Sequence, residues 1–201
     1  MILLVAAEFS WRTARQNVID GLSKTQWYWA KVLLVPLLSA LFLALRAAIG
    51  GSFALAGTDL AAGAQWFGAA QLAALGGMFV TGLGFASLAL FVAVAIRASG
   101  PAMAVWFAWF AFGERLVVGG LGALFEGWRP ILKWAPIMTF SRLPDYIQYD
   151  REALRRAAER AVEQERPVPE LEALGPAFAG SFLWIAALLV FGWLWYRKRD
   201  L

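Results

Sequence analysis

Residues 28–48 read YWAKVLLVPLLSALFLALRAA, an apolar run whose only charges, Lys31 and Arg46, lie toward its two ends. A helix of about 20 apolar residues matches the hydrocarbon core of a membrane, which is roughly 30 Å thick. Long basic side chains near its ends can reach the polar boundary. Similar runs recur over residues 72–96, 101–125 and 177–196. The sequence therefore predicts an all-α, polytopic transmembrane helical bundle with four spans, in one domain over residues 1–201.

The composition agrees with a membrane protein and excludes several kinds of chemistry. Of the 201 residues, 61% are apolar and 16% are charged, whereas a soluble domain carries about 25% charged residues. The net charge of +4 fits basic residues at cytoplasmic membrane edges better than a nucleic-acid surface. The chain has no His and no Cys, which excludes Ser-His catalysis, His-based metal sites and thiol chemistry. We expect no catalytic, metal or cofactor site.

An amphipathic segment, EFSWRTARQNVIDGL, occupies residues 8–22 ahead of the first span. Apolar residues recur in it at spacings of three and four, which is typical of one helix face; they are Trp11, Ala14, Val18 and Leu22. Polar residues lie largely on its other faces; they are Arg12, Arg15, Gln16 and Asp20. The spacing predicts one amphipathic helix over residues 8–22.

The end of this helix has the residue types of a sharp joint. Gly21 suits a helix stop, because Gly adopts the left-handed conformation at little cost. Ser23 and Gln26 have the spacing of a capping box. A second helix is therefore predicted to begin near Lys24 and to continue into the first span.

Two charged residues, Glu114 and Arg115, lie inside the run 101–125, and glycines around them suggest a broken helix. Adjacent helical positions point apart, so the two are not a simple pair. An acid within the membrane is a functional-site hypothesis by default. The alternative is a structural hydrogen bond to another subunit or to a broken helix end.

The remaining segments set the expected topology. Residues 126–176 are polar and are expected to lie outside the cell, whereas the apolar residues 1–7 are expected to be the last turns of a span whose beginning is missing. Counting spans places residues 8–27, the turn at 97–100 and the C-terminus on one side. The basic cluster at 197–199 favours that side as cytoplasmic.

The segment ahead of the first span resembles the cytoplasmic elbow of ABC-2 type transporter permeases, the membrane subunits of a class of ABC exporters. The matching residues are Glu8, Arg12-Thr13, Arg15, Val18-Ile19, Gly21, Ser23-Lys24 and Lys31. Arg12 stands where Gly is common in that family. A span with an internal acid, a polar segment and a last span with a basic tail are similar as well. Family members usually have six spans, so the resemblance implies that the chain is truncated at its N-terminus.

The resemblance implies a permease subunit in the plasma (bacterial inner) membrane, acting as a homodimer or heterodimer. A separate cytoplasmic ABC ATPase would bind ATP, since this chain has no G-x-x-x-x-G-K-[ST] motif of its own. The residues expected to couple to that ATPase are Glu8, Trp11, Arg12, Arg15, Gln16, Asp20, Gly21 and Ser23. The alternative is a membrane protein that is not driven by ATP, either a structural or interaction subunit or a small channel polarised by Glu114. A helix that only anchors the chain at the interface is a further alternative for residues 8–22.

Overall fold

A computed structural model of the chain describes residues 1–57, 69–132, 134–148, 159–160 and 174–199. These residues form helices joined by short connections, and no strand occurs among them. In chain order the elements are α1 (Ile2–Ser10), α2 (Thr13–Ile19), α3 (Lys24–Val32), α4 (Leu34–Gly57), α5 (Ala69–Ile96), α6 (Ser99–Ala108), the π-helix η2 (Trp109–Gly113), α7 (Glu114–Leu124), the 3-10 helix η3 (Glu126–Trp128), α8 (Arg129–Leu132), α9 (Pro136–Gln148) and α11 (Leu174–Lys198). The predicted all-α class is confirmed.

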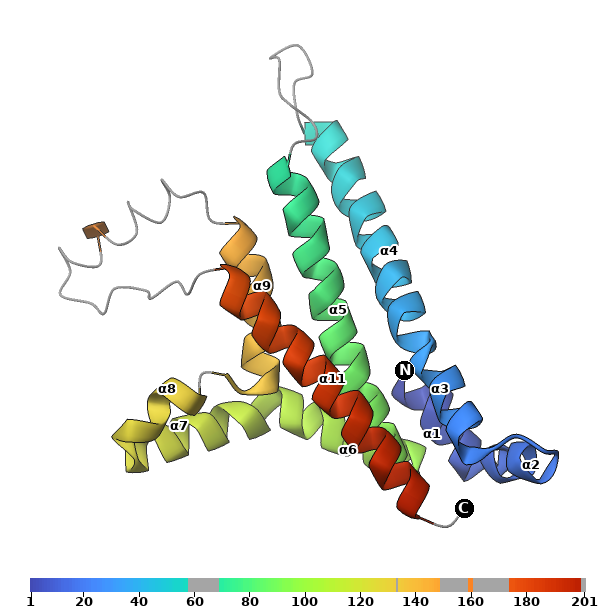
Figure 1. The fold of residues 1–201 in the computed structure, drawn as a ribbon. Helices are drawn as coiled ribbons and strands as arrows, with labels where there is room; N and C mark the ends of the chain where they lie inside the picture. The colour runs from blue at the N-terminus through green and yellow to red at the C-terminus, as the bar shows by residue number, and fades with distance from the viewer. Residues whose placement is uncertain (58–68, 133, 149–158, 161–173, 200–201) are drawn as a thin grey trace.

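Helix α5 is the central helix of the bundle. Helices α4, α9 and α11 run beside it, and α1 lies against its lower part in Figure 1. Its residues Leu90, Ala93 and Val94 are fully buried where these helices meet. In a membrane, close packing of such side chains and hydrogen bonds between helices hold a bundle together, because lipid is as apolar as the buried side chains.

Four helical stretches are long and apolar enough to cross a membrane. They are Lys24–Phe53, Leu72–Ile96, Ser99–Leu124 and Gly175–Lys198. The first stretch contains both α3 and α4, which meet at Leu33. Pro36 lies in the first turn of α4, where backbone N–H groups have no partner within the helix, so its missing N–H costs no hydrogen bond. The fold is that expected of a multi-pass membrane protein.

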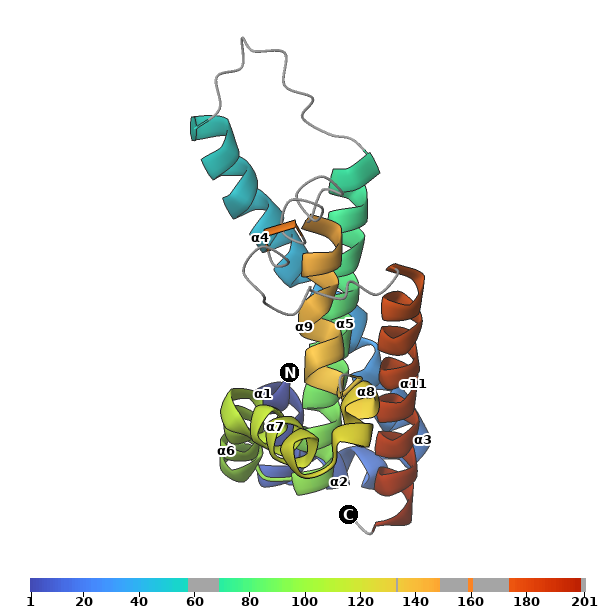
Figure 2. The same ribbon diagram turned by 90° about the vertical axis from the view of Figure 1, so that its left-hand side faces the viewer.

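The third stretch differs from the other three in direction. Figures 1 and 2 show α6, η2 and α7 running crosswise to α5 and α11, near the end of the molecule where α11 terminates. The prediction for residues 101–125 therefore agrees with the structure in length and apolarity, but the stretch does not run beside the other spans. Its start contacts α1 and α5, and η2 lies between α6 and α7.

The expected outside segment, 126–176, also differs in part. Within it, α9 packs along both α5 and α11. Phe140 and Leu143 of α9 are fully buried, and the Thr81 hydroxyl of α5 donates a 3.1 Å hydrogen bond to the Phe140 carbonyl. This part of the polar segment thus belongs to the bundle, because its apolar face is covered by two long helices. Residues 149–158 and 161–173 lie outside the described part.

The N-terminal helix α1 packs against α5 and α6. Val5 and Ala6 are fully buried, whereas Leu3 and Leu4 on the other side are exposed. Of residues 1–7, expected as the last turns of a span, residues 2–7 form one helix with residues 8–10. This helix carries the chain directly into the amphipathic segment.

Candidate functional site

The chain breaks between α1 and α2, so the predicted single helix over residues 8–22 is wrong. Residues 8–10 end α1, and Arg12 has a φ of 60°, in the left-handed region. The Arg12 amide donates to the Phe9 carbonyl at 3.1 Å, and the Thr13 hydroxyl donates to the Glu8 carbonyl at 3.1 Å. These bonds satisfy carbonyls at the end of α1 and turn the chain into α2. A left-handed backbone of this kind suits Gly better than a residue with a Cβ.

The turn at Arg12 changes which residues of the segment are covered. Ala14 is buried at 1% exposure, but Trp11 and Leu22, expected on the same face, are 76% and 43% exposed. Spacing arguments failed for Trp11 because it lies before the break and does not share the face of α2. The polar residues are all exposed, as expected for a face free to meet a partner; they are Arg12, Arg15, Gln16 and Asp20. The Gln16 side chain donates to the Asp20 carboxylate at 3.0 Å.

The joint between α2 and α3 has the geometry that its sequence predicts. Gly21 has a φ of 109°, its amide donates to the Val18 carbonyl at 3.2 Å, and the Leu22 amide donates to the Asn17 carbonyl at 3.0 Å. This pair of bonds is a Schellman motif. Ser23 and Gln26 form the predicted capping box, with bonds of 3.2 Å from the Gln26 amide and 2.9 Å from the Ser23 amide. Both ends of the joint are therefore closed by hydrogen bonds.

Glu8, which the resemblance places among the residues that couple to the ATPase, faces inward. Its carboxylate pairs with Lys31 of α3 and accepts a 3.1 Å hydrogen bond from the Trp27 indole. Lys31 also lies over the Trp27 ring, 5.3 Å from its centroid. Because the pair is largely covered, the Coulomb attraction is less screened than at an open surface. Glu8 thus fastens the end of α1 to α3.

An aromatic cluster extends this connection to the last helix. Phe9, Trp27 and Tyr196 lie with ring centroids 4.9 to 6.1 Å apart, and Tyr28 stacks on Tyr196 at 6.2 Å. The Tyr28 hydroxyl donates a 2.7 Å hydrogen bond to the Leu189 carbonyl of α11. Tyr28 and Tyr196 are fully buried. Three helices, α1, α3 and α11, are therefore locked together by rings that have few rotatable bonds.

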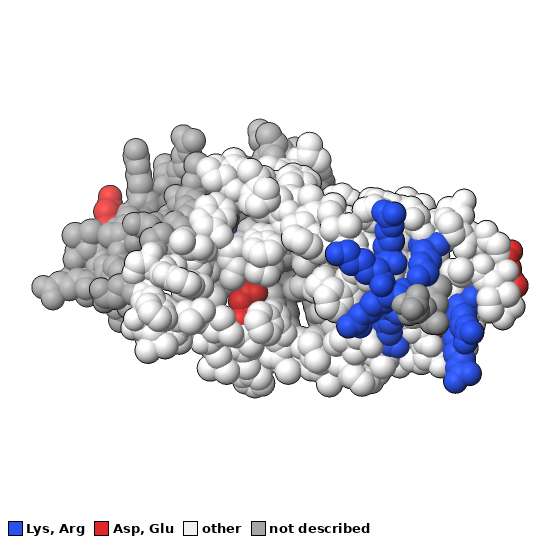
Figure 3. Space-filling model, turned by 60° about the horizontal axis from the view of Figure 1, so that its bottom comes forward, with Lys and Arg blue, Asp and Glu red and all other residues white. Residues whose placement is uncertain are grey.

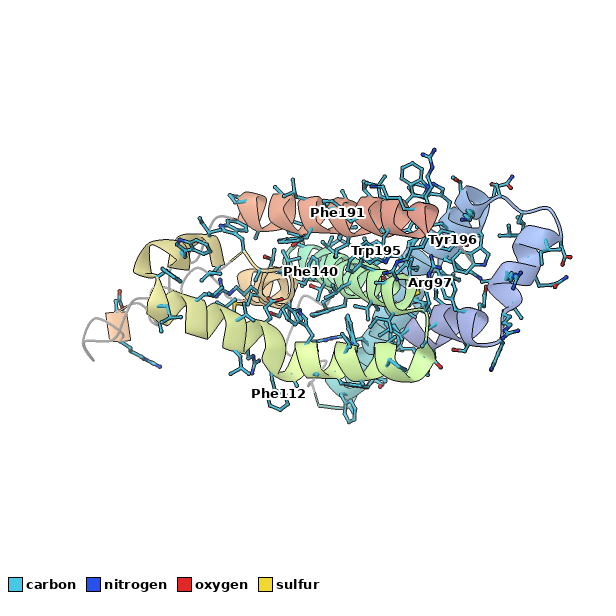
Figure 4. The ribbon with its side chains drawn as sticks, turned by 90° about the horizontal axis from the view of Figure 1, so that it is seen from below. Arg97, Phe112, Phe140, Phe191, Trp195 and Tyr196 are labelled. Atoms are coloured by element: carbon cyan, nitrogen blue, oxygen red, sulfur yellow. The ribbon has the colours of Figure 1, made fainter. Side chains whose placement is uncertain are left out.

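Arg97 connects a fourth segment, the turn between α5 and α6, to the aromatic cluster that joins α1, α3 and α11. Its φ is 59°, and its guanidinium lies 5.4 Å from the Phe9 ring centroid and 5.6 Å from that of Tyr196. Figure 4 shows Arg97 and Tyr196 together between the last helix and the α5–α6 turn. The Ser99 amide also donates to the Ser10 hydroxyl at 3.4 Å. Cation–π contacts of this kind are worth about 0.5–2 kcal/mol.

The end of α11 closes this site. The Lys24 ammonium donates to the Arg199 carbonyl at 2.9 Å, and the Arg199 guanidinium donates to the Ala95 carbonyl of α5 at 3.3 Å. Arg199 also lies 4.5 Å from the centroid of the Trp195 ring. We call this end of the molecule the basic end. It is defined by Arg12, Arg15, Lys24, Lys31, Arg97, Arg197, Lys198 and Arg199.

Figure 3 shows Lys and Arg side chains gathered around the end of α11 on this face. The exposed ones are Arg12, Arg15, Arg197, Lys198 and Arg199. Two described carboxylates lie near them. The Glu8 carboxylate forms an ion pair with Lys31, and the Asp20 carboxylate accepts a hydrogen bond from Gln16. The face therefore presents a positive potential to whatever adjoins it.

Glu114 lies apart from the basic end and has a structural role. It is 3% exposed and accepts hydrogen bonds from the amides of Ile137 at 3.0 Å and Met138 at 2.7 Å. Those amides belong to the first turn of α9, whose N–H groups need an outside partner. Arg115 is exposed, so the two neighbours point apart as predicted. Two hypotheses were open for Glu114, a functional acid within the membrane and a structural hydrogen bond. The structure contains a hydrogen bond of the second kind, to a helix end.

Sequence reasoning missed the residues that hold the basic end together. Phe9, Trp27, Tyr28, Arg97 and Tyr196 drew no functional interpretation, although Trp and Tyr near the ends of apolar runs were a usable signal. Their contacts join segments far apart in the chain, which no spacing rule detects.

In comparisons with known proteins, no family model, no curated protein and no solved structure matches this chain.

Proposed function

We propose that the chain is the membrane permease subunit of an ABC-2 type exporter in the plasma (bacterial inner) membrane. A separate cytoplasmic ABC ATPase binds ATP and docks on α2 at the basic end. The permease acts as a dimer and moves its substrate by alternating access when ATPase closure pushes on residues 8–24. The observation that carries the proposal is an exposed polar face on α2, held by closed joints to the bundle.

The joints supply the rigidity that coupling requires. A push on α2 reaches α3 through the Schellman motif and the capping box, without a flexible linker. From α1 and α3 it passes to α11 through the aromatic cluster, and to α5 and α6 through Arg97 and Ser99. These contacts support motion of α2 and the helices as one body. A loosely tethered helix would dissipate the same push in its own rearrangement.

One observation favours a second candidate, in which α2 only anchors the chain at the membrane interface. Trp11 and Ile19 are strongly exposed beside Arg12 and Arg15, and apolar and basic residues together are typical of an interfacial helix. That candidate belongs with a membrane protein that is not driven by ATP. It requires no ATPase partner.

Reversing both exposed arginines separates the two candidates. The variant Arg12→Glu with Arg15→Glu should release the ATPase, because truncating one partner of a buried charge pair costs about 2–5 kcal/mol at an interface. The test is co-expression of permease and candidate ATPase, followed by recovery of the ATPase on immobilised permease. The matched control is Arg142→Glu, since Arg142 is also an exposed arginine but lies on α9 and not on α2.

An anchoring helix predicts a different result. The double reversal would then weaken contact with anionic lipid by roughly 1 kcal/mol per basic residue, and bound ATPase would be unchanged. Equal recovery of ATPase with wild type and with the double variant refutes the coupling role of α2.

A further inference from the structure

Arg46 is a cation inside an apolar helix and has no protein partner among the described residues. It lies on α4, exposed, within the stretch Lys24–Phe53 that is long enough to span a membrane. The ion pair that the described part of the chain contains joins Lys31 to Glu8, far from α4's Arg46. Arginine within a membrane helix is rare and marks a site by default. We therefore expect a guanidinium at this position to bind an anionic group.

Arg46 lines a cavity of about 270 Å³ between α4 and α5. Thr81 and Met78 of α5 form its other wall. The single Thr81 hydroxyl proton is already shared between two carbonyls, that of Gly77 at 2.9 Å and that of Phe140 at 3.1 Å. Arg46 is therefore the charged group of this cavity and its main polar recognition element.

A second, larger cavity of about 430 Å³ adjoins the first. The two share Ser39, Phe42, Gly82 and Phe85 in their linings, so they form one groove along α4 and α5. The larger cavity continues toward α1 and α6 and is almost entirely apolar, with Met103 and Trp106 at its α6 side. Figure 2 shows α4 and α5 diverging toward the ends farther from the basic end.

The order of these groups along α4 matches the order of groups in a phospholipid. From Arg46 to Phe53, the end of the apolar stretch, is about 10 Å at 1.5 Å per residue, and a long arginine side chain can reach toward that boundary. The apolar cavity lies on the other side of Arg46, toward the middle of the molecule. A headgroup phosphate at Arg46 would therefore sit near the membrane surface while its acyl chain filled the groove.

We propose that this groove binds an anionic phospholipid of the leaflet opposite the basic end. The phosphate contacts the Arg46 guanidinium, whose fork of N–H donors matches phosphate oxygens. One acyl chain occupies the apolar cavity between α1, α4, α5 and α6. The site is independent of ATPase docking on α2, because none of its lining residues belongs to α2 or α3.

The test is native mass spectrometry of the purified full chain with phosphatidylglycerol and phosphatidylcholine that carry the same acyl chains. Wild type should retain phosphatidylglycerol preferentially, and Arg46→Gln should lower that preference by about fivefold, the effect of one basic residue near an anionic group. Arg115→Gln is the matched control, since Arg115 is also an exposed arginine in an apolar stretch but lines neither cavity. It should leave the preference unchanged.

Three outcomes overturn the proposal. If Arg46→Gln retains the full preference for phosphatidylglycerol over phosphatidylcholine, Arg46 is not part of a lipid site. An equal loss with Arg115→Gln means that general surface charge, not the groove, selects the lipid. Displacement of bound lipid by excess glycerol phosphate, which has no acyl chain, means that the site holds a free phosphate and not a phospholipid.

Discussion

Two arginines, Arg12 and Arg97, adopt backbone conformations that suit glycine. Their φ values are 60° and 59°, where a residue with a Cβ pays about 1–2 kcal/mol. Arg12 lies between α1 and α2, Arg97 lies between α5 and α6, and both belong to the basic end. Strained non-glycine residues tend to persist where their side chains are used. For Arg97 the use is visible in its contacts with Phe9 and Tyr196, and for Arg12 the proposed use is docking.

Replacing Arg12 separates its backbone cost from its side-chain role. Arg12→Gly should be more stable than Arg12→Ala by about 1 kcal/mol, because Gly adopts the left-handed turn without strain. Both variants lack the guanidinium and should recover less ATPase than wild type by a similar amount. Thermal unfolding of the purified variants measures the first effect and co-purification measures the second. A glycine variant less stable than the alanine variant would contradict the conformational argument.

At the scale of elements, Glu114 holds α9 in place. The π-helix η2 directly precedes Glu114, and Gly113 is required there because a Cβ would meet the Trp109 ring at 2.6 Å. Pro136 begins α9, where its missing N–H is harmless, and the next two amides bond to the Glu114 carboxylate. A carboxylate at a helix N-terminus also opposes the positive end of the helix dipole. One residue thus connects the crosswise helices to the bundle.

Removing this carboxylate should loosen α9. Glu114→Ala leaves two partly buried amides without a partner, at up to about 1–3 kcal/mol each. Glu114→Gln keeps one acceptor oxygen and should be destabilised less. The neighbouring Arg115→Ala, at an exposed position, should change stability by less than about 0.5 kcal/mol. Thermal unfolding in detergent gives the order of the three variants. Equal stability of Glu114→Ala and Arg115→Ala would mean that Glu114 does not support α9.

At the scale of the whole molecule, eight Lys and Arg residues of the described part gather at one end of the bundle, the basic end. The ends of α3 and α11 and the α5–α6 turn meet at the basic end, whereas α4 and α5 extend away from it. Cytoplasmic edges of membrane proteins carry an excess of Lys and Arg. The proposed orientation therefore puts the basic end in the cytoplasm and the far end of α4 outside.

Single introduced cysteines test this orientation, since the chain has none of its own. Ser52→Cys, near the far end of α4, should react with an impermeant maleimide on intact cells, and Lys198→Cys should react only after the membrane is opened. Neither position is covered by other described residues, so lack of reaction is not caused by burial within the protein. Labelling of residue 198 but not of residue 52 on intact cells would reverse the orientation.

The crosswise direction of α6, η2 and α7 leaves many large apolar side chains uncovered. Phe107, Phe112, Leu116 and Leu124 are all more than half exposed, and Phe112 points away from the bundle in Figure 4. These side chains need lipid or another subunit around them. The proposed permease dimer would supply such a surface.

The sequence by itself determined the features that depend on residues a few positions apart. Four long apolar runs, the stop at Gly21 and the capping box of Ser23 and Gln26 were all predicted and are present. A helix turn or a cap closes over three to five residues, so its physics is contained in a short window. Length and apolarity are likewise properties of one segment.

Only the tertiary structure decided the contacts that build the candidate site. Glu8 pairs with Lys31, Tyr28 bonds to the Leu189 carbonyl, and the Glu114 carboxylate receives the amides of α9. The crosswise direction of α6–α7 belongs to the same class. Each of these features depends on contacts between segments that are far apart in the chain. A buried carboxylate, for example, is stable only where the fold brings a cation or unpaired N–H groups next to it.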